Sequence, residues 1–225
     1  MTATSRHPRP VRAVVCDIDH TLTTQGSAGA MARALGVPAA AHSAIYRDHQ
    51  AGQLDHARTR AQLLTLWRNT GRATRQTFTT AFETVPLREG ATRLAAHLHD
   101  PGILLCLITS SAQLYADITA ARLGAVAAYG NGTLIFDAAG HLTDLDFSLD
   151  TGPLKARHLA RFCAEHHISP DEIIAVGNGP DDRSLFEVTG RGILLTRSTT
   201  SPQAAAWRTA TTLEAVTAVI DEAGH

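Results

Sequence analysis

The sequence has little of several features that characterise whole classes of protein. Its 225 residues carry 20 Lys and Arg against 21 Asp and Glu, which leaves a formal net charge of −1. Proteins whose main partner is nucleic acid need a clustered basic excess, so we expect no nucleic-acid partner. The longest aliphatic run, residues 103–108, is too short to span a bilayer, and we expect no membrane partner.

Cysteine is also scarce. The three cysteines, Cys16, Cys106 and Cys163, lie far apart, which is the spacing of neither a zinc site nor a disulfide framework. Such spacing is typical of small buried side chains in a reducing compartment. Residues 1–12 are basic and lack the apolar stretch of a secretory signal. We therefore expect a basic tail at the start of the chain and a cytoplasmic protein.

The pattern of apolar residues divides the chain into two parts. Residues 11–16 form a β-branched run of strand length that ends in two acids. Residues 27–83 then show helical periodicity, broken at proline and glycine positions, and no convincing strand. An all-helical block inside an otherwise alternating chain is typical of an inserted module. We predict a helical cap over residues 26–83 and a core made of residues 1–25 and 84–225.

From residue 87 onward the predicted strands and helices alternate. The strands are expected at 103–108, 125–129, 173–176 and 192–195, and the helices at 89–99, 113–123, 154–166, 183–188 and 213–222. Residues 133–136 and 141–147 flank an Asp-Ala-Ala-Gly turn and predict a β-hairpin on the edge of the sheet. The alternation predicts an α/β fold of three layers, in which helices cover both faces of a mainly parallel sheet.

Ligands of such sheets bind at the carboxyl ends of the strands, so the residues that follow each strand are the candidate site. Asp17 and Asp19 follow the first strand, and two carboxylates spaced two apart can face one ligand. One can act as a nucleophile while the other holds a proton as general acid. Thr109 and Ser110 follow the second strand and open a helix, which is a natural anion site.

Two further groups lie later in the chain. Lys155 stands near the start of a predicted helix, and Asp181 and Asp182 follow the strand at 173–176. Each has an ordinary structural explanation, since a lysine is usually solvated and acids often open helices. All four groups nevertheless fall where the sheet rule places a ligand. Coincidence is a poor explanation for that agreement.

These residues resemble the motifs of the haloacid dehalogenase (HAD) superfamily of phosphohydrolases. The resemblance covers residues 13–213 and rests on Asp17, Asp19 and Thr21 in a DxDxT motif, Thr109, Lys155, and the acids Asp181 and Asp182 after Val-Gly. It implies a HAD-like Rossmannoid core. The helical insertion resembles the C1-type cap of the phosphoserine phosphatase-like branch.

The resemblance also implies a phosphatase reaction on a small phosphorylated metabolite. Asp17 would attack phosphorus and form an aspartyl-phosphate, while Asp19 would protonate the leaving oxygen and later activate water. The implied phosphate-binding residues are Thr109, Ser110 and Lys155. The implied cofactor is Mg²⁺, and its implied ligands are Asp17, the carbonyl of Asp19, and Asn178 or Asp182.

The acidic loop departs from the family pattern. In the phosphoserine phosphatase-like branch it reads Gly-Asp-Gly-x-Asn-Asp, whereas residues 177–182 read Gly-Asn-Gly-Pro-Asp-Asp. Asn178 therefore replaces the usual metal-binding aspartate. An amide oxygen can bind Mg²⁺ but brings no charge, and Asp181 is placed to restore the missing charge.

The residues expected to recognise the substrate also depart from the family. The glutamate and arginine that recognise phosphoserine would fall on Gly26 and Leu63, although Arg60 is one helical turn away from the latter. We therefore do not expect phosphoserine as the substrate. Gln50 and His56 stand where apolar residues would be, which favours a polar leaving group such as a sugar, cyclitol or nucleoside. The alternative is that both side chains face solvent.

Other functions of this motif set remain open. A phosphotransferase or phosphomutase would use the same aspartyl-phosphate and pass it to a hydroxyl group. A catalytically silent binding protein is the third reading, which only Asn178 supports. Dehalogenases lack an equivalent of Asp19, and a phosphonatase would need a cap lysine, of which residues 27–83 have none.

Overall fold

The computed structural model describes residues 9–196 and 205–224, so the first eight residues of the expected basic tail lie outside it. Its main element is a six-stranded sheet with the strand order β3-β2-β1-β6-β7-β8, in which every pairing is parallel. The strands are β1 (Ala13–Cys16), β2 (Leu104–Ile108), β3 (Ala127–Tyr129), β6 (Ile173–Gly177), β7 (Gly192–Leu195) and β8 (Arg208–Ala210).

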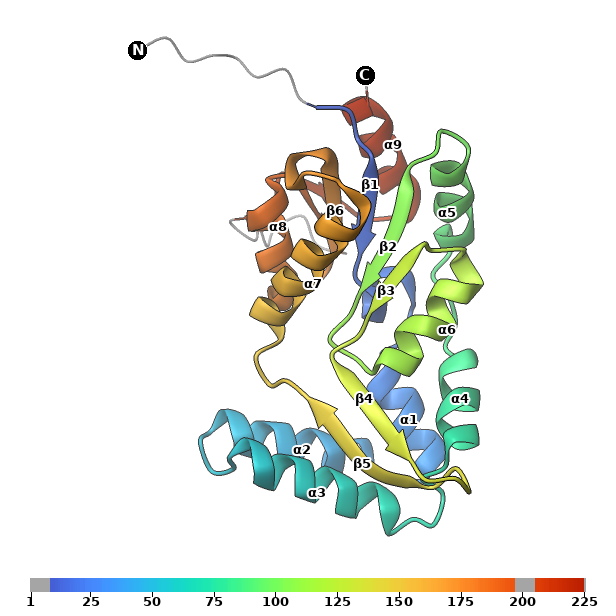
Figure 1. Ribbon diagram of the computed structural model, residues 1–225, viewed down its shortest axis with the longest axis vertical. Helices are drawn as coiled ribbons and strands as arrows, with labels where there is room; N and C mark the ends of the chain where they lie inside the picture. Colours follow the sequence, from blue (N-terminus) through green and yellow to red (C-terminus); the bar gives the residue numbers. More distant parts are fainter. Residues whose placement is uncertain (1–8, 197–204, 225) are drawn as a thin grey trace.

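Helices cover both faces of this sheet (Figure 1). The helices α5 (Ala91–His99), α6 (Gln113–Leu123) and α9 (Leu213–Gly224) share a buried cluster with Val14 and Cys16 of β1. The helices α7 (Thr151–His166) and α8 (Arg183–Thr189) share a second cluster with Ala13 and Val15. Because alternate residues of a strand face opposite sides, β1 contributes to both clusters. The predicted three-layer α/β fold is confirmed.

The helical segment, residues 26–83, contains α1 (Ser27–Leu35), α2 (Ala39–Gln50), α3 (His56–Arg68) and α4 (Arg75–Glu83). The side chains of Asp55 and Thr74 cap α3 and α4 by accepting hydrogen bonds from backbone amides. In Figure 1 the segment lies beyond the carboxyl ends of the sheet strands. Its role as a cap stays a prediction.

The predicted hairpin forms, but its predicted place on the edge of the main sheet was wrong. Strands β4 (Gly132–Phe136) and β5 (Leu142–Phe147) make a separate two-stranded antiparallel sheet. The apolar face of β5 buries Leu142, Leu145 and Phe147 in the same cluster as the helical segment. The alternating pattern of a strand shows that one face needs covering, and here the helices cover it.

Two further differences from the sequence predictions concern short or atypical segments. Strand β8 was not predicted, because it has three residues, two of them exposed. Helix α7 begins at Thr151, three residues before its predicted start at 154, because Pro153 lies in its first turn, where a missing amide hydrogen is tolerated.

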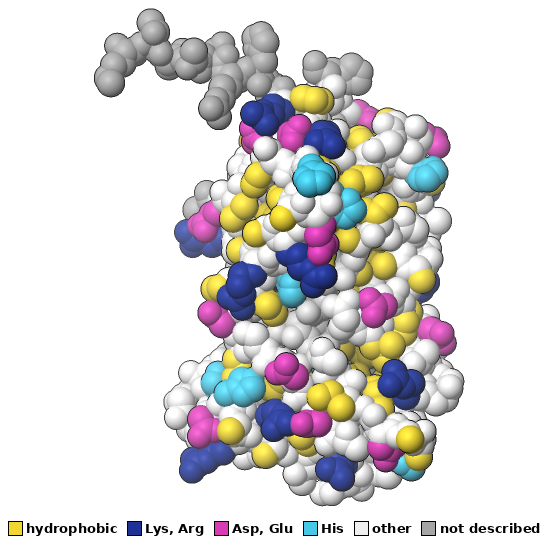
Figure 2. All heavy atoms as spheres, in the orientation of Figure 1, with side chains coloured by type: hydrophobic (Ala, Val, Ile, Leu, Met, Phe, Trp, Pro, Cys, Tyr) yellow, Lys and Arg dark blue, Asp and Glu magenta, His cyan; other side chains and the backbone are white. Residues whose placement is uncertain are grey.

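The surface carries charges of both signs. On the face shown in Figure 2, basic and acidic side chains are interspersed rather than gathered by sign. Within residues 9–196 and 205–224, no helix combines the length and the apolar character that crossing a bilayer would require.

Gly192 provides a test of the packing between β7 and α8. An added Cβ at this position would overlap the ring of Phe186, which is buried. We expect Gly192→Ala to lower the free energy of unfolding by about 1–3 kcal/mol, because the ring has to shift. Chemical denaturation measures this loss.

Gly29→Ala is the matched control, since Gly29 lies inside α1 and an added Cβ would meet only Arg33 Nη1, at 3.5 Å. That variant should gain up to about 1 kcal/mol, because alanine favours the helix. Equal midpoints for both variants and the parent would contradict the packing described here.

Candidate active site

The candidate active site is organised around one buried lysine. Lys155 lies in the first part of α7, its side chain is 1% exposed, and it is the only lysine in the sequence. Its Nζ atom lies 2.9 Å from Asp17 Oδ1, 2.6 Å from Asp182 Oδ1 and 3.0 Å from Asp181 Oδ2. A buried ammonium group needs paired charges, and the loops after β1 and β6 supply them.

The cluster of Lys155, Asp17, Asp181 and Asp182 carries more negative than positive charge. Burial alone would lower the pKa of Lys155, but the carboxylates around it outweigh burial and raise it. Burial raises the pKa of Asp17 to about 7, although Lys155 opposes this shift. Burial would also raise the pKa of Asp181, yet Lys155 and Ser110 outweigh it and the pKa is lowered.

Asp17 is held by the turn that follows it. Thr21 Oγ1 donates a hydrogen bond to Asp17 Oδ2 at 2.9 Å, and the amide of Asp17 donates to the carbonyl of Val176 in β6. The turn Ile18–Leu22 is wide, since the amide of Thr23 reaches back to the carbonyl of Ile18. Asp17 is therefore fixed to both central strands while its side chain reaches Lys155.

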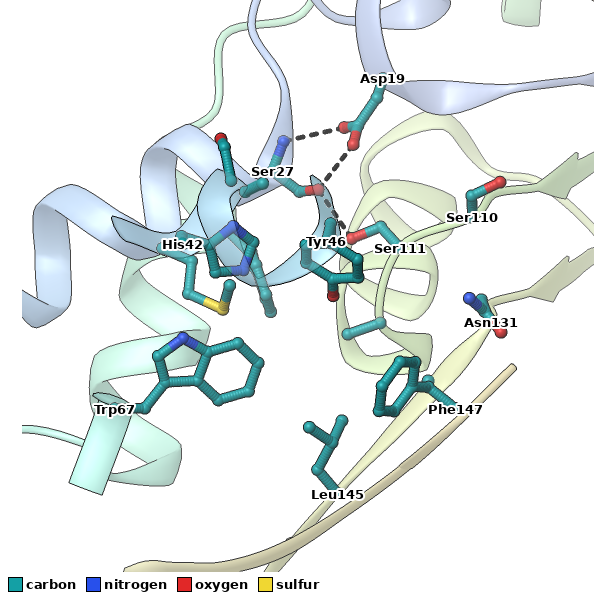
Figure 3. A pocket seen from close by; sticks show the side chains of 16 residues that line it. Asp19, Ser27, His42, Tyr46, Trp67, Ser110, Ser111, Asn131, Leu145 and Phe147 are labelled. Carbon is teal, nitrogen blue, oxygen red and sulfur yellow. Dashed lines mark hydrogen bonds between the residues drawn. The ribbon is translucent and has the colours of Figure 1, made fainter. Parts of the chain in front are cut away.

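The second carboxylate of the motif is bound to the helical segment. Asp19 Oδ1 accepts the amide of Ser27 at 2.9 Å, and Asp19 Oδ2 accepts its hydroxyl at 2.6 Å. The Ser27 hydroxyl also lies 2.7 Å from the hydroxyl of Ser111, as Figure 3 shows. Ser27 was not predicted as a site residue. The feature of the sequence that could have identified Ser27 is its position at the start of the first helix after the DxDxT motif.

The predicted anion-site residues lie beside the lysine cluster. Thr109 is buried, and its Oγ1 accepts the amide of Ser111 at 3.2 Å. Ser110 Oγ donates to Asp181 Oδ2 at 2.5 Å. The structure thus brings Ser110 into contact with Asp181, while Thr109 is bonded to Ser111. Their role in binding phosphate stays a prediction.

Asp182 organises the acidic loop. Its Oδ2 accepts the amides of Asn178 and Gly179, both at 2.9 Å, while its Oδ1 is bound to Lys155. An added Cβ at Gly177 would overlap this carboxylate, so the loop needs glycine there. Protein donors thus occupy both oxygens of Asp182, just as Lys155 and Thr21 occupy those of Asp17, and both Asp182 and Asn178 stay predicted metal ligands.

The residues present fit a magnesium ion. Within the described residues, no group of three or more His, Cys, Asp or Glu side chains is arranged to hold a metal ion by itself. Mg²⁺ usually binds one or two carboxylates and completes its shell with other oxygens, water and substrate phosphate. The Asp17 carboxylate, the Asp19 carbonyl, and the Asn178 amide or the Asp182 carboxylate are donors of this type. The excess negative charge around Lys155 favours a divalent cation in the same place.

The predicted substrate residues of the helical segment do not line a cavity with Asp19. Gln50 is exposed at the end of α2. His56 Nε2 lies 2.7 Å from the carbonyl of Phe147, and Arg60 donates to the carbonyl of Leu145 and pairs with Asp144. His56 and Arg60 therefore attach α3 to β5. Contact of all three with substrate stays a prediction.

A cavity of about 370 Å³, the Asp19 cavity, lies between the site, the helical segment and the hairpin. Asp19 and Ser111 line one end, and His42, Trp67 and Phe147 are among the residues that line the other (Figure 3). The sequence analysis did not find His42 or Trp67. They come from different helices, α2 and α3, and no spacing in the sequence relates them.

Comparison with known proteins agrees with this geometry. A profile of haloacid dehalogenase-like hydrolases matches residues 14–187. A phosphoserine phosphatase from Archaeoglobus fulgidus is 29% identical over 113 residues, which are 50% of this chain but only 32% of that protein.

Solved structures share the fold. A probable phosphoserine phosphatase from Vibrio cholerae has a TM-score of 0.74 at 20% identity, over 96% of this chain and 65% of that one. A substrate-bound phosphoserine phosphatase has a TM-score of 0.71 at 19% identity, over 94% of this chain and 99% of that one.

Lys155→Met tests the charge cluster. Without the ammonium group three carboxylates lose their partner, so we expect a loss of about 3–5 kcal/mol in unfolding free energy near neutral pH. The folded-state pKa values of these acids then rise, and the folded variant takes up protons that the unfolded chain does not. The deficit relative to the parent should therefore be largest at about pH 8 and shrink towards about pH 5.

Denaturation in EDTA measures this deficit, and Arg161→Met is the matched control. Arg161 lies on the same helix in an exposed pair with Glu165, so its loss should cost less than about 1 kcal/mol at either pH. A Lys155→Met deficit that grows on acidification would contradict the cluster described here.

Proposed function

The chain belongs to the haloacid dehalogenase-like hydrolase family, and from this premise we propose that it is a Mg²⁺-dependent phosphatase acting on a small phosphomonoester. The observation that supports the proposal most directly is the separation of two carboxylates. Asp17 is buried against the cation Lys155, whereas Asp19 lines a cavity. The first arrangement suits a nucleophile and the second suits an acid that meets the leaving group.

In the first half of the reaction, an Asp17 carboxylate oxygen forms a bond to phosphorus as the ester P–O bond breaks. Protonated Asp19 gives its proton to the leaving oxygen, so the products are the free alcohol and an aspartyl-phosphate on Asp17. The hydrogen bonds from Ser27 hold the Asp19 carboxyl at the cavity while it gives up this proton.

In the second half, water attacks the phosphorus of the aspartyl-phosphate. Asp19, now ionised, takes a proton from this water, and the bond between phosphorus and Asp17 breaks. Inorganic phosphate leaves, and both carboxyl groups return to their starting protonation. The reaction consumes one water for each ester.

The main physical difficulty is that a phosphate dianion repels the Asp17 carboxylate. Lys155 is the cation within contact of Asp17, and Ser110 is hydrogen-bonded to Asp181 of the same cluster. Thr109 and Ser110 are the residues proposed to donate hydrogen bonds to the phosphate. Mg²⁺, when bound, would neutralise further charge on the phosphate oxygens. The carboxylates of Asp181 and Asp182 also contact Lys155 Nζ and hold it in place.

We also propose that the helical segment acts as a cap over this site. Its first helical residue, Ser27, is bonded to Asp19, and its helices α2 and α3 form the far wall of the Asp19 cavity. A covered cavity of this size admits small molecules in preference to a phosphorylated protein surface.

Asp17→Asn tests the nucleophile. We expect phosphate release from para-nitrophenyl phosphate with Mg²⁺ to fall by at least about 10³-fold, because an amide cannot form the intermediate. EDTA should abolish the activity of the parent. Asp100→Asn, which changes an exposed acid far along the chain, should leave the rate unchanged. Product analysis with an added alcohol separates hydrolysis from transfer to a hydroxyl group.

Asp19→Asn tests the acid in the same assay. An alkyl leaving group needs the proton more than nitrophenolate does, so the variant should lose about tenfold more rate with an alkyl phosphate than with the nitrophenyl ester. Equal losses on the two esters would remove Asp19 from this role.

Two substitutions of Asn178 test the proposed metal site. Asn178→Asp adds a carboxylate and should lower the Mg²⁺ concentration for half-maximal activity by about tenfold, because ligand charge increases cation affinity. Asn178→Ala removes the donor oxygen and should raise that concentration. If neither substitution alters the Mg²⁺ titration, the ion is held elsewhere.

A further inference from the structure

The turn that carries Asp19 has an unusual backbone. Within this turn, Ile18–Leu22, His20 has a φ of 60° and a ψ of 2°. In the described part of the chain the other non-glycine residue with a positive φ is His167, which ends α7, a common place for this conformation. Left-handed backbone is unfavourable for a residue with a Cβ atom and persists where the surrounding contacts hold it. The contacts that hold His20 also fix Asp19, its neighbour in the chain.

Arg88 binds three consecutive carbonyl groups of this turn. Its Nε atom donates to the carbonyl of Thr21 at 2.7 Å, and its Nη2 atom donates to the carbonyl of His20. Its backbone amide donates to the carbonyl of Leu22 at 2.8 Å. A guanidinium group is planar and presents its donors in a fixed arrangement, so it can bind two neighbouring carbonyls at once. The peptide groups that follow His20 and Thr21 are thereby held in one orientation.

Arg88 lies where the chain returns from the helical segment to the core. The outgoing and the returning crossings pair through an antiparallel bridge between Thr23 and Leu87. Next to this bridge, the amide of Thr24 donates to the carbonyl of Pro86 at 3.1 Å. The side chain of Arg88 therefore reaches the turn from the returning crossing, and it ties the turn to both connections of the helical segment.

Ser27 holds Asp19 at the other end of its side chain (Figure 3). The amide and the hydroxyl of Ser27 donate to the two carboxylate oxygens, at 2.9 and 2.6 Å. These two bonds hold the carboxylate, whereas the contacts of Arg88 hold the backbone beside it. A general acid has to present its proton within hydrogen-bond distance of the leaving oxygen, so a small displacement of either part of Asp19 lowers the rate.

We propose that Arg88 is a positioning residue for Asp19: its guanidinium group holds the turn at His20, and the turn aims the Asp19 carboxyl at the leaving oxygen. Arg88 is not among the residues that line the Asp19 cavity, so it acts through Asp19 rather than on the substrate. The proposal rests on the phosphatase activity proposed above and adds a residue to the machinery of that reaction.

Arg88→Met removes the donors and keeps a long side chain. We compare kcat/KM for benzyl phosphate with kcat/KM for para-nitrophenyl phosphate at saturating Mg²⁺, because benzyl alcohol needs a proton on leaving more than nitrophenolate does. We expect Arg88→Met to lower the ratio of the two values by about five- to tenfold, a part of the about 10²- to 10⁴-fold that a general acid contributes. A loss of folded protein would lower both values equally and leave the ratio unchanged.

Two further variants separate this role from general effects on the crossing. Arg88→Lys keeps a cationic donor that can bind one of the two carbonyls, so its ratio should lie between those of the parent and Arg88→Met. Arg122→Met is the matched control, since Arg122 Nη1 donates to the carbonyl of Val85 on the same returning crossing, at 2.8 Å. It removes a guanidinium group from the crossing without removing a bond to the turn, and it should leave the ratio unchanged.

Hydrogen exchange gives a readout that does not depend on turnover. The amide of Ser27 donates to Asp19 Oδ1, so the exchange rate of this amide, measured by NMR, reports how firmly the carboxylate is held. We expect Arg88→Met to raise the exchange rate of the Ser27 amide by at least about fivefold, the size of one net hydrogen bond. Arg122→Met should leave that rate unchanged.

The outcomes separate the two proposals. Failure of the parent protein to hydrolyse either ester contradicts the phosphatase, and the exchange rate of the Ser27 amide then still decides whether Arg88 holds Asp19. If the parent is active, equal losses on the two esters in Arg88→Met overturn the positioning role, and so does the same change of ratio in Arg122→Met. An exchange rate of the Ser27 amide that Arg88→Met leaves unchanged overturns it as well.

Discussion

The ion cluster around Lys155 is the interaction on which the rest of the site depends. One buried ammonium contacts carboxylates from the loops after β1 and β6, and it comes from a helix on the face of the sheet. Removing any of these segments would leave a buried charge without its partner, which is more costly than breaking an exposed pair. The single side chain of Lys155 therefore fixes the carboxyl ends of β1 and β6, the acidic loop and α7 relative to one another.

Under the proposed function, the same cluster also supplies the chemistry of the site. A cluster optimised for stability alone would match its charges, whereas here three carboxylates face one lysine. Burial raises the pKa of Asp17, and the excess of negative charge favours a divalent cation. Asp19, by contrast, is bonded to Ser27 of the helical segment, so that segment positions the proposed general acid.

Much of this arrangement follows from local patterns in the sequence. The periodicity predicts the helix at 113–123 with its observed bounds, and the sheet rule predicts that Asp17 and Lys155 meet at the carboxyl ends of the strands. The sequence patterns do not predict features that depend on tertiary packing. An amphipathic hairpin shows which face is apolar but not what covers it, so β4 and β5 form their own sheet. Gln50 was placed by its spacing from the motifs, and spacing does not show which helical face meets a cavity.

Under the proposed function, catalysis and substrate choice belong to two parts of the fold. The loops after the strands hold the carboxylates and α7 holds the lysine, and these groups would supply chemistry common to any phosphomonoester. In the helical segment, the guanidinium of Arg60 is used to attach α3 to β5. No Lys or Arg lines the adjacent Asp19 cavity, so under the proposed function we expect the shape of its walls, rather than a positive charge, to select the leaving group.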